Sequence, residues 1–216
     1  MIDKIIYSGI VFAGFFAIMN PISAMSIFLT LTTNDNEEES KKIAQHALLT
    51  AFFIVLFFSI AGNFILHFFG VTFTALRLTG GIIVGLIGYE MLQGHQSNVN
   101  KPAKETIEKV IKEEGSIAIT PLGIPLLAGP GVIITAMNFS AGNISNFFVT
   151  VFSFGVLCII TYFVLIFGKQ IKKILGSSAL KVITRMMGLV LAVIGMQMIL
   201  EGTYSAISEF QNSHFF

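Results

Sequence analysis

The 216-residue chain is 54% hydrophobic and 12% charged, and it contains 22 phenylalanines. Such a composition excludes an ordinary soluble domain, because a soluble core needs neither this apolar fraction nor apolar runs of this length. The formal net charge of +1 gives no basis for a nucleic-acid partner. The single cysteine, Cys158, excludes an intrachain disulfide and a cysteine-based metal site. We therefore expect an all-α polytopic membrane protein embedded in the lipid bilayer.

Six apolar segments are long enough to cross a bilayer at about 1.5 Å of rise per residue. The six segments lie at residues 5–31, 43–69, 72–93, 116–140, 147–168 and 182–200. The first hydrophobic run is longer than a signal peptide and lacks a small-residue cleavage site, which indicates a retained span. In the long polar connection, residues 106–114 carry Glu and Lys at helical spacing, which predicts a short surface helix. The tail at 203–216 is polar to amphipathic and is predicted to be interfacial or frayed.

Lysine and arginine residues predict how the chain is oriented in the membrane. If all six segments span it, eleven of the 13 basic residues fall on one side, and only Lys4 and Arg77 fall on the other. The eleven are Lys41, Lys42, Lys101, Lys104, Lys109, Lys112, Lys169, Lys172, Lys173, Lys181 and Arg185. Because cytoplasmic loops are enriched in Lys and Arg, both termini are expected to lie outside. A rival topology, with the first and fourth segments as re-entrant hairpins, splits the basic residues 7 against 6 and loses the bias, so we favour six spans.

Two of the six segments contain signals that break a helix. Segment 116–140 holds three prolines, the last inside Gly129-Pro130-Gly131, and segment 5–31 holds Asn20-Pro21. Proline lacks the N–H and clashes with the carbonyl one turn back. Because asparagine is a favoured N-cap and proline a favoured first helical residue, Asn20-Pro21 predicts a half-helix that starts about midway through its span, and Gly129-Pro130 predicts the same more weakly. Broken backbone is tolerated in hydrocarbon only where protein or a polar cavity satisfies it, so the breaks mark a candidate site.

The two halves of the chain resemble each other at a nearly constant offset. An Arg–Gly–Gly pattern recurs after 108 residues, and Asn20-Pro21 precedes Gly129-Pro130 by 109 residues. The first copy of the pattern is Arg77, Gly80 and Gly94, and the second is Arg185, Gly188 and Gly202. Because three is odd, a repeated three-helix unit must run the opposite way through the membrane. We therefore predict two inverted three-helix repeats with broken first helices, at 1–94 and 116–202, joined by a charged linker at 95–115; many secondary transporters hold substrate between such repeats.

The starts of the two half-helices have the chemistry to bind a small zwitterion. Helix N-termini attract anions, so the free N–H groups of residues 22 and 23, and of residues 131 and 132, can receive a carboxylate. An ammonium can meet carbonyls freed by the prolines or the side-chain oxygens of Ser23, Thr135 or Asn138, and the glycines allow close approach of a small substrate. The predicted substrate-binding residues are Asn20, Pro21, Ser23, Gly129, Pro130, Gly131, Thr135 and Asn138. Packing kinks filled by neighbouring side chains are the alternative interpretation.

Three more polar residues are candidates for a cavity wall or a gate. Asn63 lies inside the second span, where it either lines a cavity or ties helices together by hydrogen bonds. Arg77 and Arg185 either snorkel to the membrane interface or clamp helices, with Glu90, Glu201 or backbone carbonyls as partners. No Asp or Glu lies near the middle of any span, so coupling to Na+, coupling to H+ and uncoupled exchange all stay open. We expect no other cofactor and no metal site.

The segments NPISAMSIFLTLT, RLTGGIIVG and ITPLGIPLLAGPGVIITA resemble the MarC family of six-span bacterial inner-membrane proteins. The resemblance covers nearly the whole chain, and PLGIPLLAGPG is its most specific part. In the family's first motif, approximately N-P-x-G-x-x-P, Ser23 and Ser26 stand here in place of the glycine and the second proline. The resemblance implies a multi-pass protein of the bacterial inner (plasma) membrane that transports small neutral amino acids.

These observations favour a secondary transporter of small neutral amino acids or similar small metabolites, which binds substrate between two broken helices at the membrane midplane. A channel or a non-transporting membrane scaffold is the alternative, with the breaks serving packing. An enzyme is not expected, because neither G-x-S-x-G nor H-E-x-x-H occurs and no histidine lies mid-span. The direction of transport and the oligomeric state stay open.

Overall fold

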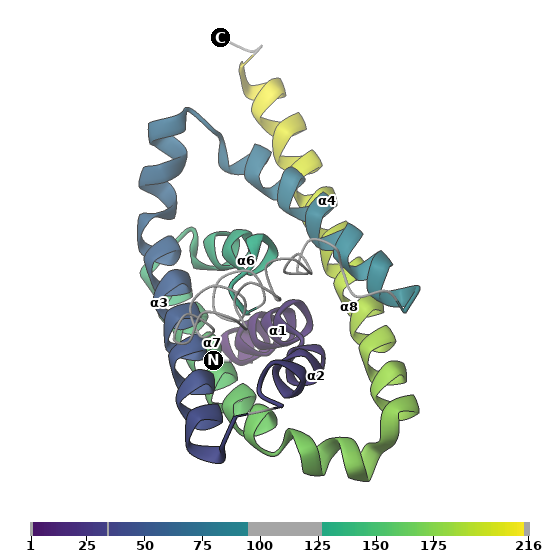
Figure 1. The fold of residues 1–216 in the computed structure, drawn as a ribbon. Coiled ribbons are helices and arrows are strands. Elements are labelled where there is room, and N and C mark those ends of the chain that lie inside the picture. The colour runs from purple at the N-terminus through teal and green to yellow at the C-terminus, as the bar shows by residue number, and fades with distance from the viewer. Residues whose placement is uncertain (1, 34, 95–126, 214–216) are drawn as a thin grey trace.

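The structure, a computed structural model, describes residues 2–33, 35–94 and 127–213. These residues form helices and no strand (Figure 1). The helices are α1 (Ile2–Met19), α2 (Pro21–Leu31), α3 (Glu37–Phe69), α4 (Phe73–Leu92), α6 (Pro130–Ser140), α7 (Ile144–Ile166) and α8 (Gly168–Ser213). The predicted all-α class therefore holds for the described part of the chain.

Local sequence signals mark where several of these helices begin and end. Asn36 accepts a hydrogen bond from the Glu39 N–H at 2.8 Å, and its own N–H donates to the Glu39 carboxylate at 3.2 Å, which forms a capping box at the start of α3. Asn143 caps α7 through the Asn146 N–H at 2.9 Å. α3 ends at Gly70, whose φ of 64° is a left-handed conformation that glycine adopts without strain.

Five stretches of described residues are long and apolar enough to cross a membrane. They are Lys4–Leu31, Glu37–Gly62, Phe73–Leu92, Ile144–Ile166 and Ser178–Gln211. Each overlaps one of the six predicted segments. The remaining segment, 116–140, is described only from residue 127 and contributes α6. Its earlier part and the predicted surface helix at 106–114 lie outside the described residues.

The last helix is longer than predicted. We expected a span at 182–200 followed by an interfacial or frayed tail, but α8 runs from Gly168 to Ser213 and bends at Gly176, where φ is 70° and ψ is 162°. Near its end, the Thr74 hydroxyl of α4 donates to the Glu209 carboxylate of α8 at 2.8 Å. The described tail is therefore helical and not frayed, and the contact with Thr74 of α4 holds its end.

The helices form a central group with two flanks. Figure 1 shows α1, α2, α6 and α7 at the centre, α3 along one side, and the pair of α4 and α8 along the other. Large side chains that are 0–2% exposed fill the centre: Phe15, Phe28, Leu127, Phe154, Leu157 and Leu165. The outer faces of α3 and α7 instead expose Phe53, Phe57, Phe64, Phe148 and Phe152. Apolar surface of this extent needs a covering, which lipid provides.

α4 and α8 run antiparallel and approach each other very closely. At one end Leu78 lies beside Gly202, and at the other end the Arg185 guanidinium lies beside Gly94. Between these ends, a methyl group on Gly88 would collide with the backbone of α8. Small residues allow such close backbone contact between membrane helices. The two helices therefore stay in close contact along the length of α4, on one side of the central group (Figure 1).

Candidate functional site

The first helix break lies at Asn20, between α1 and α2. Asn20 is 6% exposed, and its φ of 46° is the only positive φ of a non-glycine residue in the described part of the chain. Asparagine tolerates this conformation better than most residues with a side chain. The Asn20 Oδ1 accepts a hydrogen bond from the Ser23 N–H at 3.3 Å, and its Nδ2 donates to the Ser23 hydroxyl at 2.7 Å. Because Pro21 is the first residue of α2, the predicted N-cap and proline start are confirmed.

The same cap corrects one expectation about the start of α2. We expected the Ser23 N–H to be free for an anion, but it donates to the Asn20 side chain. The break releases an acceptor instead, since the Ala17 carbonyl would normally pair with the N–H of residue 21, and Pro21 has none. Ala17 is fully buried. The start of α2 therefore offers a capped N-terminus and a backbone oxygen inside the protein.

The second helix break lies at Gly129-Pro130, just before α6. Gly129 is the N-cap residue and makes no side-chain cap bond, and Pro130 is the first residue of the helix. Gly129 and Gly131 are buried, whereas Pro130 is exposed. A Cβ on Gly131 would lie 3.3 Å from Ile18 Cγ2 and 3.2 Å from Ile87 Cδ1. The predicted helix start at Gly129-Pro130 is confirmed, and the absence of a side chain at Gly131 lets Ile18 of α1 and Ile87 of α4 approach it closely.

Both helix starts lie against the same turn of α4. The Asn20 Nδ2 lies 4.0 Å from Met91 Sδ. Ile87, which precedes Met91 by one helical turn, lies against Gly131. Ile18, two residues before Asn20, also lies against Gly131. The structure therefore brings together two breaks that are 109 residues apart in the sequence.

Buried hydroxyl groups lie on the helices around these breaks. Thr135 of α6 is fully buried one turn after Gly131, and its Oγ1 has no hydrogen-bond partner among the described residues. Thr161 of α7, also fully buried, donates to Met19 Sδ at 3.5 Å, which places it beside the start of α2. Sequence reasoning predicted Thr135 and missed Thr161. The signal for Thr161 is a buried polar face on an apolar helix, made by Thr150, Ser153 and Thr161.

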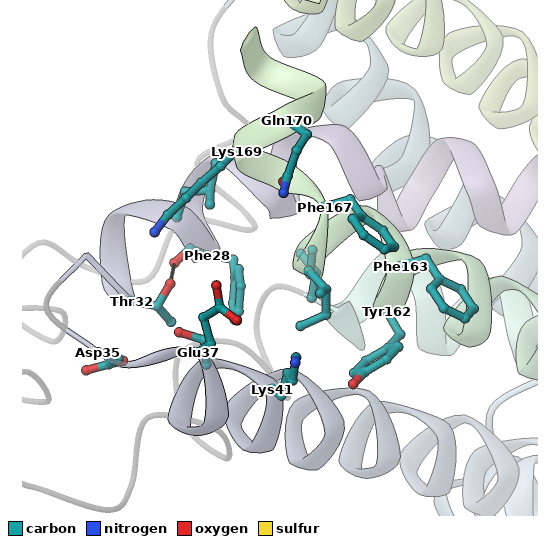
Figure 2. A pocket seen from close by; sticks show the side chains of 14 residues that line it. Phe28, Thr32, Asp35, Glu37, Lys41, Tyr162, Phe163, Phe167, Lys169 and Gln170 are labelled. Atoms are coloured by element: carbon teal, nitrogen blue, oxygen red, sulfur yellow. Dashed lines mark hydrogen bonds between the residues drawn. The ribbon is translucent and has the colours of Figure 1, made fainter. Parts of the chain in front are cut away.

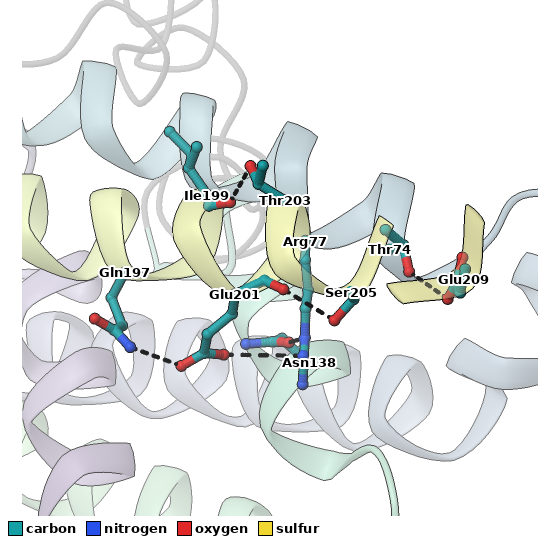
Figure 3. A network of polar contacts seen from close by, with 9 residues as sticks. All are labelled: Thr74, Arg77, Asn138, Gln197, Ile199, Glu201, Thr203, Ser205 and Glu209. Carbon is teal, nitrogen blue, oxygen red and sulfur yellow. Dashed lines mark hydrogen bonds and ion pairs between the residues drawn. The ribbon is translucent and has the colours of Figure 1, made fainter. Parts of the chain in front are cut away.

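Asn138 and Arg77 belong to a separate cluster at the other end of α6 (Figure 3). The Arg77 Nε donates to Asn138 Oδ1 at 2.9 Å, and its Nη1 lies 3.9 Å from Glu201 Oε2. The Arg77 guanidinium carbon lies 5.1 Å from the centroid of the Phe73 ring. These contacts join α4, α6 and α8, as the clamping interpretation of Arg77 predicts. Asn138 lies about 12 Å along α6 from Pro130, so the structure does not place it at the breaks.

Of the other two gate candidates, Arg185 does not join either cluster. Arg185 is exposed on α8, and its guanidinium lies beside Gly94, at the opposite end of the α4–α8 pair from Arg77. Asn63 lies within α3, and its side chain is outside the part of the chain that the structure describes.

Comparison with known proteins agrees with the resemblance seen in the motifs. A family model described as "MarC family integral membrane protein" matches residues 5–207. The chain belongs to the MarC family. A UPF0056 membrane protein of Bacillus subtilis (strain 168), YvbG, is 38% identical over 88% of this chain and 90% of its own length. The UPF0056 membrane protein PH0760 of Pyrococcus horikoshii is 36% identical over 95% of this chain and 98% of its own length. The UPF0056 membrane protein MJ1677 of Methanocaldococcus jannaschii is 34% identical over 93% of this chain and 98% of its own length. No solved structure matches the chain significantly.

This MarC protein also has a polar cavity of about 390 Å³ where α2 ends, α3 begins and α7 meets α8 (Figure 2). Its polar lining residues are Thr32, Asp35, Glu37, Ser40, Lys41, Tyr162, Lys169 and Gln170. Figure 2 shows Glu37 and Lys41 on α3 across the cavity from Lys169 and Gln170 at the start of α8. Sequence reasoning missed the cavity, because its walls are more than 100 residues apart in the chain. Among the described residues, no three His, Cys, Asp or Glu side chains are grouped as metal ligands.

Proposed function

We propose that this MarC protein is a secondary transporter of small neutral amino acids or similar small metabolites, and that it holds substrate between the starts of α2 and α6. The observation that carries the proposal is the meeting of the two helix starts on one turn of α4, at Ile87 and Met91. Each break leaves polar backbone inside the membrane, and breaks that meet place those groups around one point. The substrate class follows from the family resemblance and from the chemistry of the breaks.

The groups at the breaks suit a small zwitterion. The start of α6 has no side-chain cap, so its first N–H groups are free to bind a carboxylate. The Ala17 carbonyl and the Thr135 hydroxyl can both accept a hydrogen bond from an ammonium group. Because Gly131 has no side chain, a small substrate can approach the backbone of α6 closely. This combination favours amino acids such as glycine, alanine and serine over larger ones.

The proposal includes the inverted repeat and the orientation in the membrane. α2 and α6 have 11 residues each, and both begin with proline at the first helical position. The antiparallel pair of α4 and α8 is what the third helices of two inverted repeats would form. The lysine-rich side is assigned to the cytoplasm of a bacterial cell, with both termini outside the inner membrane. Alternating access would then move one repeat against the other, so that the binding site opens to each side of the membrane in turn.

Counterflow of labelled alanine, glycine and serine in proteoliposomes, with and without sodium and proton gradients, tests the proposal. We expect saturable uptake, and the gradient that drives it identifies the coupling ion. Ion conductance that does not depend on substrate would instead indicate the alternative, a channel. Folded protein that neither binds nor moves any of the three would favour a scaffold and would contradict the amino-acid assignment.

Thr135→Val separates a substrate contact from a packing role. Valine keeps the shape of threonine, and a buried hydroxyl without a partner destabilises a protein by about 1–3 kcal/mol, so the variant should be at least as stable as the parent. Transport should fall about tenfold, because the lost hydroxyl accepts from a charged ammonium. Thr150→Val is the matched control, since Thr150 is equally buried and unpartnered. It lies about 16 Å along α7 from Thr161. Equal transport by the two variants would remove Thr135 from the site.

A further inference from the structure

An apolar groove of about 490 Å³ separates α3 from α7 on the surface that faces lipid. Leu49 and Phe52 of α3 and Gly155 and Ile159 of α7 are among its walls. Leu49 is 55% exposed and Ile159 is 61% exposed, so the groove is open outward. Gly155 has no side chain to occupy the groove. A Cβ atom at this position would lie 3.3 Å from the Phe52 ring on the opposite wall. Both helices are candidate membrane spans, so the groove has the surroundings and the polarity for an acyl chain.

The groove adjoins the polar cavity described above. Tyr162 and Phe163 line both spaces. At the junction, the Gln45 side chain donates to the Tyr162 hydroxyl at 3.4 Å. One ligand can therefore reach from the apolar groove to the polar cavity past the contact between Gln45 and Tyr162.

The lining residues of α3 change in polarity along one face of the helix. Residues spaced by three or four positions share a helical face. From the cavity to the groove these residues are Glu37, Lys41, Gln45, Leu49 and Phe52. Charged, neutral polar and apolar groups follow in the same order as the head group, glycerol ester and acyl chain of a phospholipid.

The charges in the cavity select among head groups. Two lysines and two carboxylates line it: Lys41, Lys169, Asp35 and Glu37. Their formal charges cancel, so an anionic head group would be attracted by the lysines and repelled by the carboxylates. A head group with a phosphate and a primary amine can pair with both kinds of residue through charge-assisted hydrogen bonds. A choline head group has no N–H to donate to a carboxylate.

We propose that the groove and the cavity bind one phospholipid of the phosphatidylethanolamine type, with its phosphate at Lys41 and its amine at Glu37. One acyl chain lies along Leu49 and Ile159. The site borders the end of α2, about 16 Å of helix away from the break at Asn20. It therefore does not depend on the proposed transport function.

Tryptophan fluorescence can test this site, because the chain has no native tryptophan. Phe163→Trp places a reporter where the groove meets the cavity, and Phe53→Trp places a control on the lipid-facing side of α3, outside the groove. Each protein is reconstituted into phosphatidylcholine bilayers with equal fractions of brominated phosphatidylethanolamine or brominated phosphatidylglycerol. For each reporter we take the ratio of quenching by the two brominated lipids, and we compare this ratio between the two reporters. The depth of a tryptophan in the bilayer affects both lipids alike, so it cancels in the ratio.

We expect brominated phosphatidylethanolamine to quench the Phe163→Trp reporter about threefold more effectively than phosphatidylglycerol, the preference that one or two exposed ion pairs provide. The control reporter should show a ratio near one. Lys41→Gln and Glu37→Gln should each abolish the preference, whereas Lys42→Gln should keep it, because Lys42 carries the same charge next door but does not line the cavity. Equal ratios at the two reporters, in proteins that keep all the charged residues of the cavity, would overturn the proposal. A preference for phosphatidylglycerol would overturn it as well, because it would remove the role of the carboxylate.

Discussion

The two short helices α2 and α6 begin alike and end differently. Both follow a break and start with proline. At the end of α6, other helices hold the chain, since the Tyr7 hydroxyl donates to the Phe139 carbonyl at 2.6 Å and Arg77 donates to Asn138 at 2.9 Å. At the end of α2, the Thr32 hydroxyl donates to a carbonyl of α2 itself and borders the polar cavity. The end of α6 is held by contacts with α1 and α4, whereas the end of α2 borders a cavity.

This difference shows that similar starts do not impose similar surroundings. Under the proposed transport function, the clamped end of α6 is where one entrance would be closed. The closed end is held by side chains that can separate without unfolding a helix. Opening that end would require Arg77 to release Asn138 and Glu201.

The largest expected loss of stability comes from separating α4 from α8, the closely packed helix pair beside α2 and α6. Gly88→Ala would place a methyl group against the backbone of Ala192, which cannot move aside as a side chain could. Such overpacking should cost about 3 kcal/mol. Gly85→Ala is the control, because nothing lies within 4 Å of its Cβ position and alanine favours the helix. Reversible unfolding in SDS–detergent mixtures measures both, and equal stabilities would contradict the close contact.

Breaking the clamp at the end of α6 should have the next largest effect. Arg77→Met keeps much of the side-chain volume but removes the donor to Asn138 and the ion pair with Glu201, which should cost about 1–2 kcal/mol. Arg185→Met removes the same charge from an exposed position and should change stability by less than about 0.5 kcal/mol. The same unfolding measurement compares them. If the two variants lose the same stability, Arg77 does not act as a clamp.

Thiol labelling should distinguish the two ends directly. In a Cys158→Ala background, Ser40→Cys reports on the cavity and Ser140→Cys on the clamped end of α6; both serines are half-buried. A water-soluble maleimide should react about tenfold faster at position 40, because the clamped end must first open locally. Adding Arg77→Met should raise the rate at position 140 and leave position 40 unchanged. Equal rates in the parent background would refute the contrast between the ends.

The features that the sequence predicted well are those with local causes. Asn20-Pro21 is a cap and a proline start within two residues, so the break could be placed without knowledge of the fold. The bond from the Ser23 N–H follows from the same signal, because an N-cap side chain accepts from the second or third N–H of its helix. The left-handed backbone at Asn20 could not be foreseen. The Arg77 cluster was predicted only as one alternative, since the partners of an arginine depend on how α4, α6 and α8 align.

Features made by distant segments were missed for the same reason. The helical tail depends on Thr74, which precedes Glu209 by 135 residues. The polar cavity needs Glu37 of α3 and Lys169 of α8 on facing walls. Composition and hydropathy describe one segment at a time, so neither can indicate which polar residues will meet. The pairing of the two breaks was the exception, because a repeated pattern carries long-range information.

The smallest expected change in stability is at Asn20. Two substitutions there distinguish the role of the backbone conformation from that of the side-chain amide. Asn20→Gly removes the amide but keeps easy access to a φ of 46°, whereas Asn20→Ala removes both. Alanine should therefore be less stable than glycine here by about 1 kcal/mol, the cost of a left-handed conformation for a residue with a Cβ. If the amide helps to hold substrate, transport should fall in both variants despite their different stabilities. If Asn20→Gly transports normally, Asn20 serves only to shape the break, and the binding groups must be sought at the start of α6 and at Thr135.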